Sequence, residues 1–495
     1  LTITPRYYVS GYPLFLTEYR QDFKNSYLIL DSSFTKGYKK TSNTKLAGSR
    51  SHFFSRFDMN LIDENLKTSN IEINLQVLSN DTYLKVHDIN TELADSSYGV
   101  LENTFNYNYQ HEDLFFSSTV SAYENLTIVD RSNYEYLLPY INFEKNLVTS
   151  PKYGFLDLAS QIKVRNYDVN KQTEFLVNDF NWKSNRWISD FGFENQLLGS
   201  LKTVNYNAKN ASEFKTEDTN TEVSGVVGYL GKLNLNKKNV KNKDNYFLTP
   251  KFLLRYAPGH MRDIDGGRLK YTNLFKLNKV NEFDVLENGL SASLGFDFKK
   301  NKIKDDGSLD QEKFSLSMGQ VINAEENMDM PSSTSLDQRF SDLVGESRFR
   351  FNDSTKFKYD FSIDQSYKDI NYSEIGADIN LNDNTIFNIS YLEEKNHIGK
   401  QEYIKSDINF EIGESNSLAF STKRNLLTNS AEFYNLSYEY INDCLRAGLV
   451  FRREFYTDRD IEPENSIMFT ISLIPFANLN SPTFKSAGKS SKKWN

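Results

Sequence analysis

Hydrophobic and polar residues alternate with a period of two along most of the chain. In the segment 290–298 every second residue is apolar, from Leu290 to Phe298, and the residues between them are Ser, Ser, Gly and Asp. Successive side chains of a β-strand point to opposite faces, so such a segment predicts a strand with one apolar and one polar face. Further runs of this kind occupy 14–19, 27–31, 114–122, 314–318, 404–412, 434–440, 445–451 and 467–473.

Short runs of Asn, Asp and Ser separate many of these strands. Residues 345–363 predict a hairpin with its turn at Asn352–Ser354, and Asn382–Asn384 predict another turn, because Asn and Asp tolerate the left-handed backbone angles of tight turns. Longer polar stretches predict loops at 36–49, 207–222, 232–245, 299–312, 323–340 and 456–464. At roughly 20 residues for a strand and its connection, the chain supplies about 24 strands.

Composition narrows the fold class. Of the 495 residues, 14% are aromatic but only 38% are hydrophobic, and the mean hydropathy is −0.59. No stretch approaches the ~18 consecutive apolar residues of a membrane-spanning helix, and disordered chains are poor in aromatic residues. We therefore predict an all-β fold, a large antiparallel transmembrane β-barrel over residues 1–478 with a polar C-terminal tail over 479–495. The alternative is a soluble all-β protein, such as a β-propeller or a pair of β-sandwiches, although the blade-length repeat of a propeller is not found in the sequence.

Charged and chemically reactive residues add few constraints. The net charge is −8 and both signs are interspersed, so no basic face for nucleic acid is expected. The five histidines lack metal-ligand spacing, and the G-x-S-x-G and H-E-x-x-H motifs are absent from the sequence. We therefore expect no enzymatic activity and no cofactor. Cys444 is the single cysteine, which excludes a disulfide within the chain.

Several segments, in this order, resemble the β-barrel domain of the LptD family of lipopolysaccharide-assembly proteins. They are 1–8 (LTITPRYY), 18–20 (EYR), 50–53 (RSHF), 81–84 (DTYL), 134–139 (YEYLLP), 248–256 (LTPKFLLRY), 273–275 (NLF), 341–345 (SDLVG), 438–444 (YEYINDC) and 452–453 (RR). The family also carries an N-terminal periplasmic β-jellyroll, which these 495 residues do not contain, and a cysteine pair where this chain has Asp443 and Cys444. The resemblance implies that the first barrel strands lie upstream of Leu1.

The resemblance further implies a location and a function. It predicts an outer-membrane translocon of a Gram-negative bacterium, which inserts lipopolysaccharide into the outer leaflet through a polar lumen and a lateral seam between the first and last strands. The implied partners are an LptE-like plug lipoprotein inside the lumen and a periplasmic LptA-like bridge, reached through the jellyroll. The alternative is a large outer-membrane uptake receptor or a porin-like barrel.

Four groups of residues are candidates for these roles. The last strand would form one side of the seam with Ile467, Phe469, Ile471 and Leu473. The sugar path through the lumen would include Ser291, Ser293, Asp297, Lys358, Asp360, Asp364, Asp378 and Arg452, although any of these would equally suit a generic hydrated wall. A basic loop that meets lipopolysaccharide phosphates outside the cell, or is simply solvated, would contain Lys232, Lys237, Lys238, Lys241 and Lys243.

Cys444 is the fourth candidate. It follows a tight turn, which in barrels is typical of the periplasmic rim. The resemblance implies a disulfide between Cys444 and a cysteine of the absent N-terminal region, and the alternative is an unpaired thiol.

Overall fold

The computed structural model describes every residue except 9–10, 42–43, 129–132, 212–219, 240, 265–266, 281, 305–307, 383, 396–399, 455–464 and 474–495. Within the described residues, 26 strands form one antiparallel sheet and β4 and β5 form a separate hairpin. The predicted all-β antiparallel fold is thus confirmed. The described helices include none long and apolar enough to cross a membrane. The end of the predicted barrel at 478 and the tail 479–495 lie outside the described residues.

The strands of the first half are long, and most pair with the next strand in the chain. They are β1 (Thr2–Arg6), β2 (Leu14–Asp22), β3 (Ser26–Thr35), β4 (Tyr38–Thr41), β5 (Thr44–Ala47), β6 (Arg50–Glu64), β7 (Lys67–Leu78), β8 (Val100–His111), β9 (Leu114–Asn125), β10 (Tyr134–Ser150), β11 (Gly154–Tyr167), β12 (Lys171–Lys183), β13 (Trp187–Ile188), β14 (Phe193–Lys209), β15 (Asn220–Leu233), β16 (Leu235–Asn239) and β17 (Asp244–Ala257). The helix α1 (Tyr83–Val86) lies between β7 and β8.

The second half continues the same meander. Its strands are β18 (Gly289–Ile303), β19 (Leu309–Asn323), β20 (Leu343–Arg350), β21 (Thr355–Ile363), β22 (Ile370–Asn382), β23 (Thr385–Glu394), β24 (Gln401–Ile412), β25 (Asn416–Asn425), β26 (Ser430–Ile441), β27 (Leu445–Glu454) and β28 (Asn465–Leu473). Two short 3₁₀ helices, η2 (Tyr271–Asn273) and η3 (Ser332–Thr334), lie in the connections before β18 and β20.

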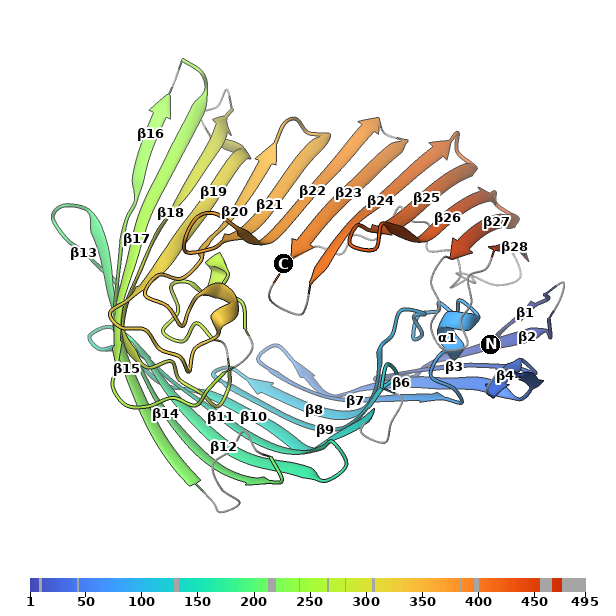
Figure 1. Ribbon diagram of the computed structural model, residues 1–495, viewed down its shortest axis with the longest axis horizontal. Coiled ribbons are helices and arrows are strands. Elements are labelled where there is room, and N and C mark those ends of the chain that lie inside the picture. The colour runs from blue at the N-terminus through green and yellow to red at the C-terminus, as the bar shows by residue number, and fades with distance from the viewer. Residues whose placement is uncertain are drawn as a thin grey trace.

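The sheet curls round until its first and last strands face each other (Figure 1). In the described residues β1 pairs with β2 and β28 pairs with β27, and no pairing joins β1 to β28. We call the line between β1 and β28 the seam.

The two faces of the sheet differ as the alternation predicts. On β18, Leu290 and Leu294 are exposed on the outer face, whereas Ser291 and Ser293 are buried on the inner face. An apolar outer band around a polar interior is the arrangement that lets a sheet satisfy its backbone within lipid.

Because every pairing is antiparallel, the connections alternate between the two ends of the sheet. Short turns such as 413–415 and 442–444 lie at one end, which we call the short-turn end. The opposite end carries three long connections, 79–99, 258–288 and 324–342. These pack against the inner face: 79–99 forms an apolar cluster with β2 and β6, and 258–288 and 324–342 form another cluster with Val321 and Val344. Figure 1 shows all three inside the curve of the sheet.

Three of the predicted loops are largely strands. The predicted loop 36–49 contains the hairpin of β4 and β5. The predicted loop 232–245 is a hairpin in which β16 pairs with β17 from Leu235↔Leu248 to Asn239↔Asp244. Likewise β18 continues to Ile303, well into the predicted loop 299–312. A strand can continue through a polar sequence that is exposed to water, because its backbone N–H and C=O groups still form hydrogen bonds with the neighbouring strand. The predicted loop 456–464 lies outside the described residues.

The outward face yields a depth-dependent prediction. Ile375 lies near the middle of β22 and Leu381 near its end, on the same exposed face. Ile375→Arg should lower the free energy of unfolding by about 2–4 kcal/mol and Leu381→Arg by only ~0–1 kcal/mol, because the cost of a charge in lipid falls towards the interface. Denaturant unfolding in lipid vesicles measures both, and equal losses would contradict the membrane-spanning assignment of β22.

Candidate functional site: the polar inner face and the seam

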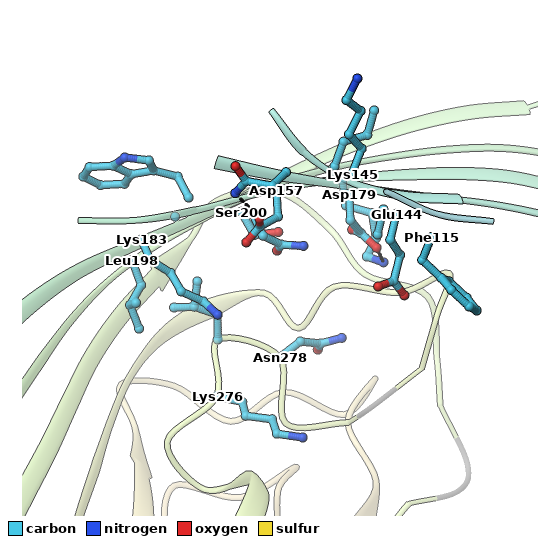
Figure 2. Close-up of a pocket in the computed structure, with 18 of the residues that line it drawn as sticks. Phe115, Glu144, Lys145, Asp157, Asp179, Lys183, Leu198, Ser200, Lys276 and Asn278 are labelled. Atoms are coloured by element: carbon cyan, nitrogen blue, oxygen red, sulfur yellow. Dashed lines mark hydrogen bonds and ion pairs between the residues drawn. The ribbon is translucent and has the colours of Figure 1, made fainter. Parts of the chain in front are cut away.

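A polar cavity lies between the inner face of β9–β15 and the connection 258–288. Its volume is about 1000 Å³. Glu144, Asp157 and Asp179 come from the strands, and Lys276 and Asn278 approach from the connection on the opposite side (Figure 2). Carboxylates and amides accept hydrogen bonds from hydroxyl groups, and lysines bind phosphate. The cavity therefore has the chemistry to take a hydrated, phosphorylated saccharide.

A buried group of three charges fixes the connection 258–288 to the wall. Glu287 Oε1 lies 3.0 Å from Arg255 Nη1 on β17 and 2.7 Å from Lys279 Nζ, and all three side chains are buried. Burial alone would raise the pKa of Glu287, but the two cations outweigh it and lower that pKa. The carboxylate is therefore ionised and compensates both cations, as buried charges require.

Apolar packing holds the same connection in place. Leu274 is fully buried in the cluster that also contains Val321. Gly319 on β19 makes room for it, because a Cβ at that position would overlap the Leu274 side chain. The connection is thus a fixed part of the lumen wall and narrows the space within the barrel.

Two of the lumen candidates, Ser291 and Asp297, contact this connection, and a third, Ser293, is buried beside them on β18 rather than open to the lumen. Ser291 and Ser293 are only 4% and 1% exposed. Asp297 accepts hydrogen bonds from Tyr271 Oη at 2.6 Å and Ser317 Oγ at 2.8 Å, and forms an ion pair with Lys251. Their polar side chains were predicted from alternation, but the connection that covers this part of the wall was not.

The other lumen candidates lie on the later strands. Lys358 Nζ is 2.6 Å from Glu374 Oε1, and Asp360 Oδ1 is 2.5 Å from Arg348 Nη1. Asp378 is exposed on β22, and Asp364 lies in the turn before that strand, where it accepts hydrogen bonds from Ser366.

Arg452 is the lumen candidate with the most distant partner. Its Nη1 atom lies 2.6 Å from Asp88 Oδ1, in the connection 79–99. Sequence reasoning missed this partner, although Asp81–Leu84 of the same connection belongs to one of the segments that resemble the LptD family.

The residues predicted at the seam are only partly described. Ile467, Phe469 and Ile471 on β28 are 73%, 65% and 59% exposed. Leu473 pairs with Leu445 at the end of the strand, but its side chain lies outside the described residues.

Cys444 is exposed in the turn 442–444, and its backbone N–H donates to Asn442 Oδ1 at 2.9 Å.

The basic residues lie at the same, short-turn end of the sheet: Lys232 on β15, Lys237 and Lys238 on β16, and Lys241 and Lys243 in the turn before β17. Lys232 Nζ forms an ion pair with Glu194 at 3.0 Å. The prediction of a single basic loop is therefore wrong, because most of that stretch is paired as a hairpin.

The structure also places Ser33, His52 and Asp31 in a row. Ser33 Oγ lies 2.5 Å from His52 Nδ1, and His52 Nε2 lies 3.2 Å from Asp31 Oδ1. Such groups can form a nucleophile and base, but here Tyr83 Oη covers Ser33 Oγ at 2.8 Å and all three residues are buried. Burial raises the pKa of Tyr83 to about 12, so its hydroxyl stays protonated. The row is a packing network that holds α1 on the wall.

The described residues contain no group of three or more His, Cys, Asp or Glu side chains placed to hold a metal ion.

Comparison with known proteins identifies the family. A family model described as LptD, LPS transport system D, matches residues 49–442, more than half of the chain. The chain belongs to the LptD family. It is an outer-membrane protein of a Gram-negative bacterium and functions there in lipopolysaccharide transport.

Other comparisons add little. No curated protein sequence matches the chain. Similar solved structures include the siderophore receptor PirA from Pseudomonas aeruginosa, at 10% identity over 93% of this chain and 86% of that one, with a TM-score of 0.44. The copper transporter OprC is 8% identical over 94% and 78% of the two chains, with a TM-score of 0.36. Scores this low carry no inference about function.

The buried charges yield the next prediction. Glu287→Gln should destabilise the protein by about 3–5 kcal/mol, because it leaves Arg255 and Lys279 buried without a counter-charge. The matched control is Glu325→Gln, at an exposed position of the connection 324–342, which should change stability by less than ~0.5 kcal/mol. Denaturant unfolding and limited proteolysis of 258–288 measure the effect. A loss for Glu287→Gln no larger than for the control would show that the three charges do not hold the connection.

Proposed function

We propose that this LptD-family protein carries the saccharide part of lipopolysaccharide through its polar lumen, while the acyl chains leave into the membrane through a lateral seam between the first and last strands of the complete barrel. The observation that carries the proposal is the charged cavity on the inner face of the sheet, together with the match of residues 49–442 to the LptD family. A sealed barrel with the same lining would pass polar solutes but would not release a lipid sideways.

The cost of moving each part of lipopolysaccharide out of its preferred solvent supports separate paths for the saccharide and the acyl chains. A glycan has many hydroxyl groups, and each costs free energy in hydrocarbon unless it finds a partner. Acyl chains are disfavoured in water for the opposite reason. A substrate with a glycan and acyl chains therefore needs a hydrated path that is open to the membrane along one side.

The orientation follows from the lengths of the connections. Outer-membrane barrels have short periplasmic turns and longer extracellular loops. The short-turn end, with Cys444 and Lys232, then faces the periplasm, so the proposed contact of the basic residues with lipopolysaccharide would occur on entry rather than outside the cell. This differs from the outer position expected from the sequence.

Partners and chemistry complete the proposal. An LptE-like lipoprotein would occupy the lumen beside the inward connections, and an LptA-like bridge would deliver lipopolysaccharide at the periplasmic end. The protein itself would make and break no covalent bond of the substrate, in keeping with the buried state of Ser33 and His52.

The cavity gives a direct test of the lumen path. Ser200 lines the cavity, and its neighbour Leu201 is exposed on the opposite, outer face of β14. Ser200→Trp should obstruct the path and reduce delivery of newly made lipopolysaccharide to the cell surface severalfold, whereas Leu201→Trp should not, because Trp is tolerated against lipid. Delivery is measured by surface modification of pulse-labelled lipopolysaccharide, at equal amounts of folded protein. Normal delivery with Ser200→Trp would exclude this part of the lumen as the route.

Cys444 has its own test. In the full-length protein we expect it to form a disulfide with a cysteine of the N-terminal region, with the oxidising machinery of the periplasm taking up the two electrons. Mass spectrometry after alkylation without reductant measures this. Quantitative alkylation of Cys444 would contradict the pairing.

A further inference from the structure

Aromatic rings form a continuous band on the outer face near the short-turn end of the sheet. They come from adjacent strands, and neighbouring ring centroids are 6.0 to 6.4 Å apart: Tyr246 of β17, Phe298 of β18, Phe314 of β19, Phe349 of β20 and Phe357 of β21. On outer-membrane barrels, girdles of aromatic residues mark the interfaces between hydrocarbon and water. We call these rings the aromatic band, and it gives the depth of the membrane surface on this part of the wall.

The strands differ in how far they continue past the aromatic band. β20 ends at Arg350 and β21 begins at Thr355, each within two residues of its ring in the band. β17 and β18, by contrast, stay paired without interruption as far as Asp244↔Lys302, and the β16–β17 hairpin projects at the upper left of Figure 1. This part of the sheet therefore carries side chains past the level of the membrane surface.

Two lysines lie on the outer face just past the aromatic band. Lys300 and Lys302 follow Phe298 at alternate positions of β18, on the same face as the exposed Leu290 and Leu294. With a rise of about 3.3 Å per residue and a strand tilt of about 40°, they lie roughly 5 Å and roughly 10 Å beyond Phe298 along the membrane normal. The headgroup layer is about 5–7 Å thick on each side of the hydrocarbon, so the two flexible side chains reach it.

A buried carboxylate holds the two ammonium groups together. Asp244 Oδ2 lies 3.1 Å from Lys300 Nζ, and Asp244 Oδ1 lies 2.8 Å from Lys302 Nζ. The Asp244 side chain is only 4% exposed, whereas the two lysine side chains are 32% and 39% exposed. One anion between two cations leaves a net positive charge, and each ammonium group has three donors. The cluster is therefore fixed in place with charge and donors available to a ligand.

The surroundings of the cluster fit the phosphate of a membrane lipid. Lys300 Nζ lies 5.5 Å from the centroid of the Tyr246 ring, so a cation and an interfacial ring occupy one place on the lipid-facing surface. Basic side chains at a membrane surface attract anionic lipids. The chain as a whole has a net charge of −8, so this local positive charge is not part of a generally basic surface.

We propose that Lys300 and Lys302 bind the phosphate of an anionic phospholipid, such as phosphatidylglycerol, at the membrane surface marked by the aromatic band. In the orientation proposed above this surface is the periplasmic leaflet, and the bound lipid anchors the β16–β19 part of the wall there. The site is on the lipid-facing side of the sheet and is separate from the cavity on the inner face. It rests on the proposed function only for the choice of leaflet.

The test measures which lipids stay bound to the protein. Full-length protein in nanodiscs of phosphatidylethanolamine with a minor fraction of phosphatidylglycerol is studied by native mass spectrometry, which distinguishes the two lipids by mass. The variant combines Lys300→Gln and Lys302→Gln with Asp244→Asn, so that no buried charge loses its partners. Retention of phosphatidylglycerol should fall about fivefold, the effect of about one unit of charge at a membrane surface. Unchanged retention would overturn the proposal.

Lys299→Gln is the matched control. Lys299 is the neighbour of Lys300 on β18 but lies on the inner face, where its Nζ is 3.4 Å from Glu312 Oε2. This variant lowers the net charge by one, as the triple variant does, and should leave the retention of phosphatidylglycerol unchanged. An equal fall in both variants would attribute the effect to the overall charge of the protein and would overturn the site.

Asp244→Asn alone protects the test against a variant that does not fold. It keeps both lysines and removes the carboxylate that competes with the lipid phosphate, so retention of phosphatidylglycerol should rise. A variant that merely disturbs the fold of β17 and β18 would lower the retention. A fall with Asp244→Asn would therefore overturn the proposal.

A further arm distinguishes phospholipid from lipopolysaccharide, because both carry phosphate. In nanodiscs where lipid A replaces phosphatidylglycerol, the triple variant and the unaltered protein should retain lipid A equally. A fall as large as that for phosphatidylglycerol would assign the site to lipopolysaccharide and overturn the proposal. The lipid readout does not depend on transport: if Ser200→Trp leaves delivery normal while the lysine variants lose phosphatidylglycerol, the lumen route is wrong and the lipid site stands.

Discussion

Within hydrocarbon, every backbone N–H and C=O group must find a partner inside the protein. The chain meets this requirement with one antiparallel sheet, in which the described strands between β1 and β28 pair on both sides, except for the short strands β13 and β16, which pair on one side only. The seam between β1 and β28 is where the described strands leave the requirement unmet.

The same sheet produces a lumen lined by polar side chains, and the inward connections give that lumen its shape. They bring their own apolar clusters, and they also bury charges such as Arg255 and Glu287. The lumen is therefore partly filled by fixed protein, and the cavity beside Asp157 and Lys276 is an open space that this filling leaves along the inner face. Selectivity for a substrate would come from this narrowed space rather than from the width of the whole barrel.

The sequence was sufficient to predict the strands of the sheet, but not the contacts made on the inner face of the sheet. Alternation identified strands such as β18, with Leu294 outside and Ser293 inside, because the period of two is a local property of the backbone. It could not show that Lys279 of the connection 258–288 reaches Ser291 on the same face, nor that Arg452 meets Asp88, 364 residues away in the chain. Contacts of that separation depend on how the sheet closes, and no local pattern encodes them.

The central claim is that this protein delivers lipopolysaccharide to the outer leaflet. Its most direct test is depletion of the protein in its native host, followed by measurement of newly made lipopolysaccharide at the cell surface. The account predicts that surface delivery falls while lipopolysaccharide accumulates inside the cell, and that the wild-type gene restores delivery. Normal surface delivery in depleted cells would contradict the account.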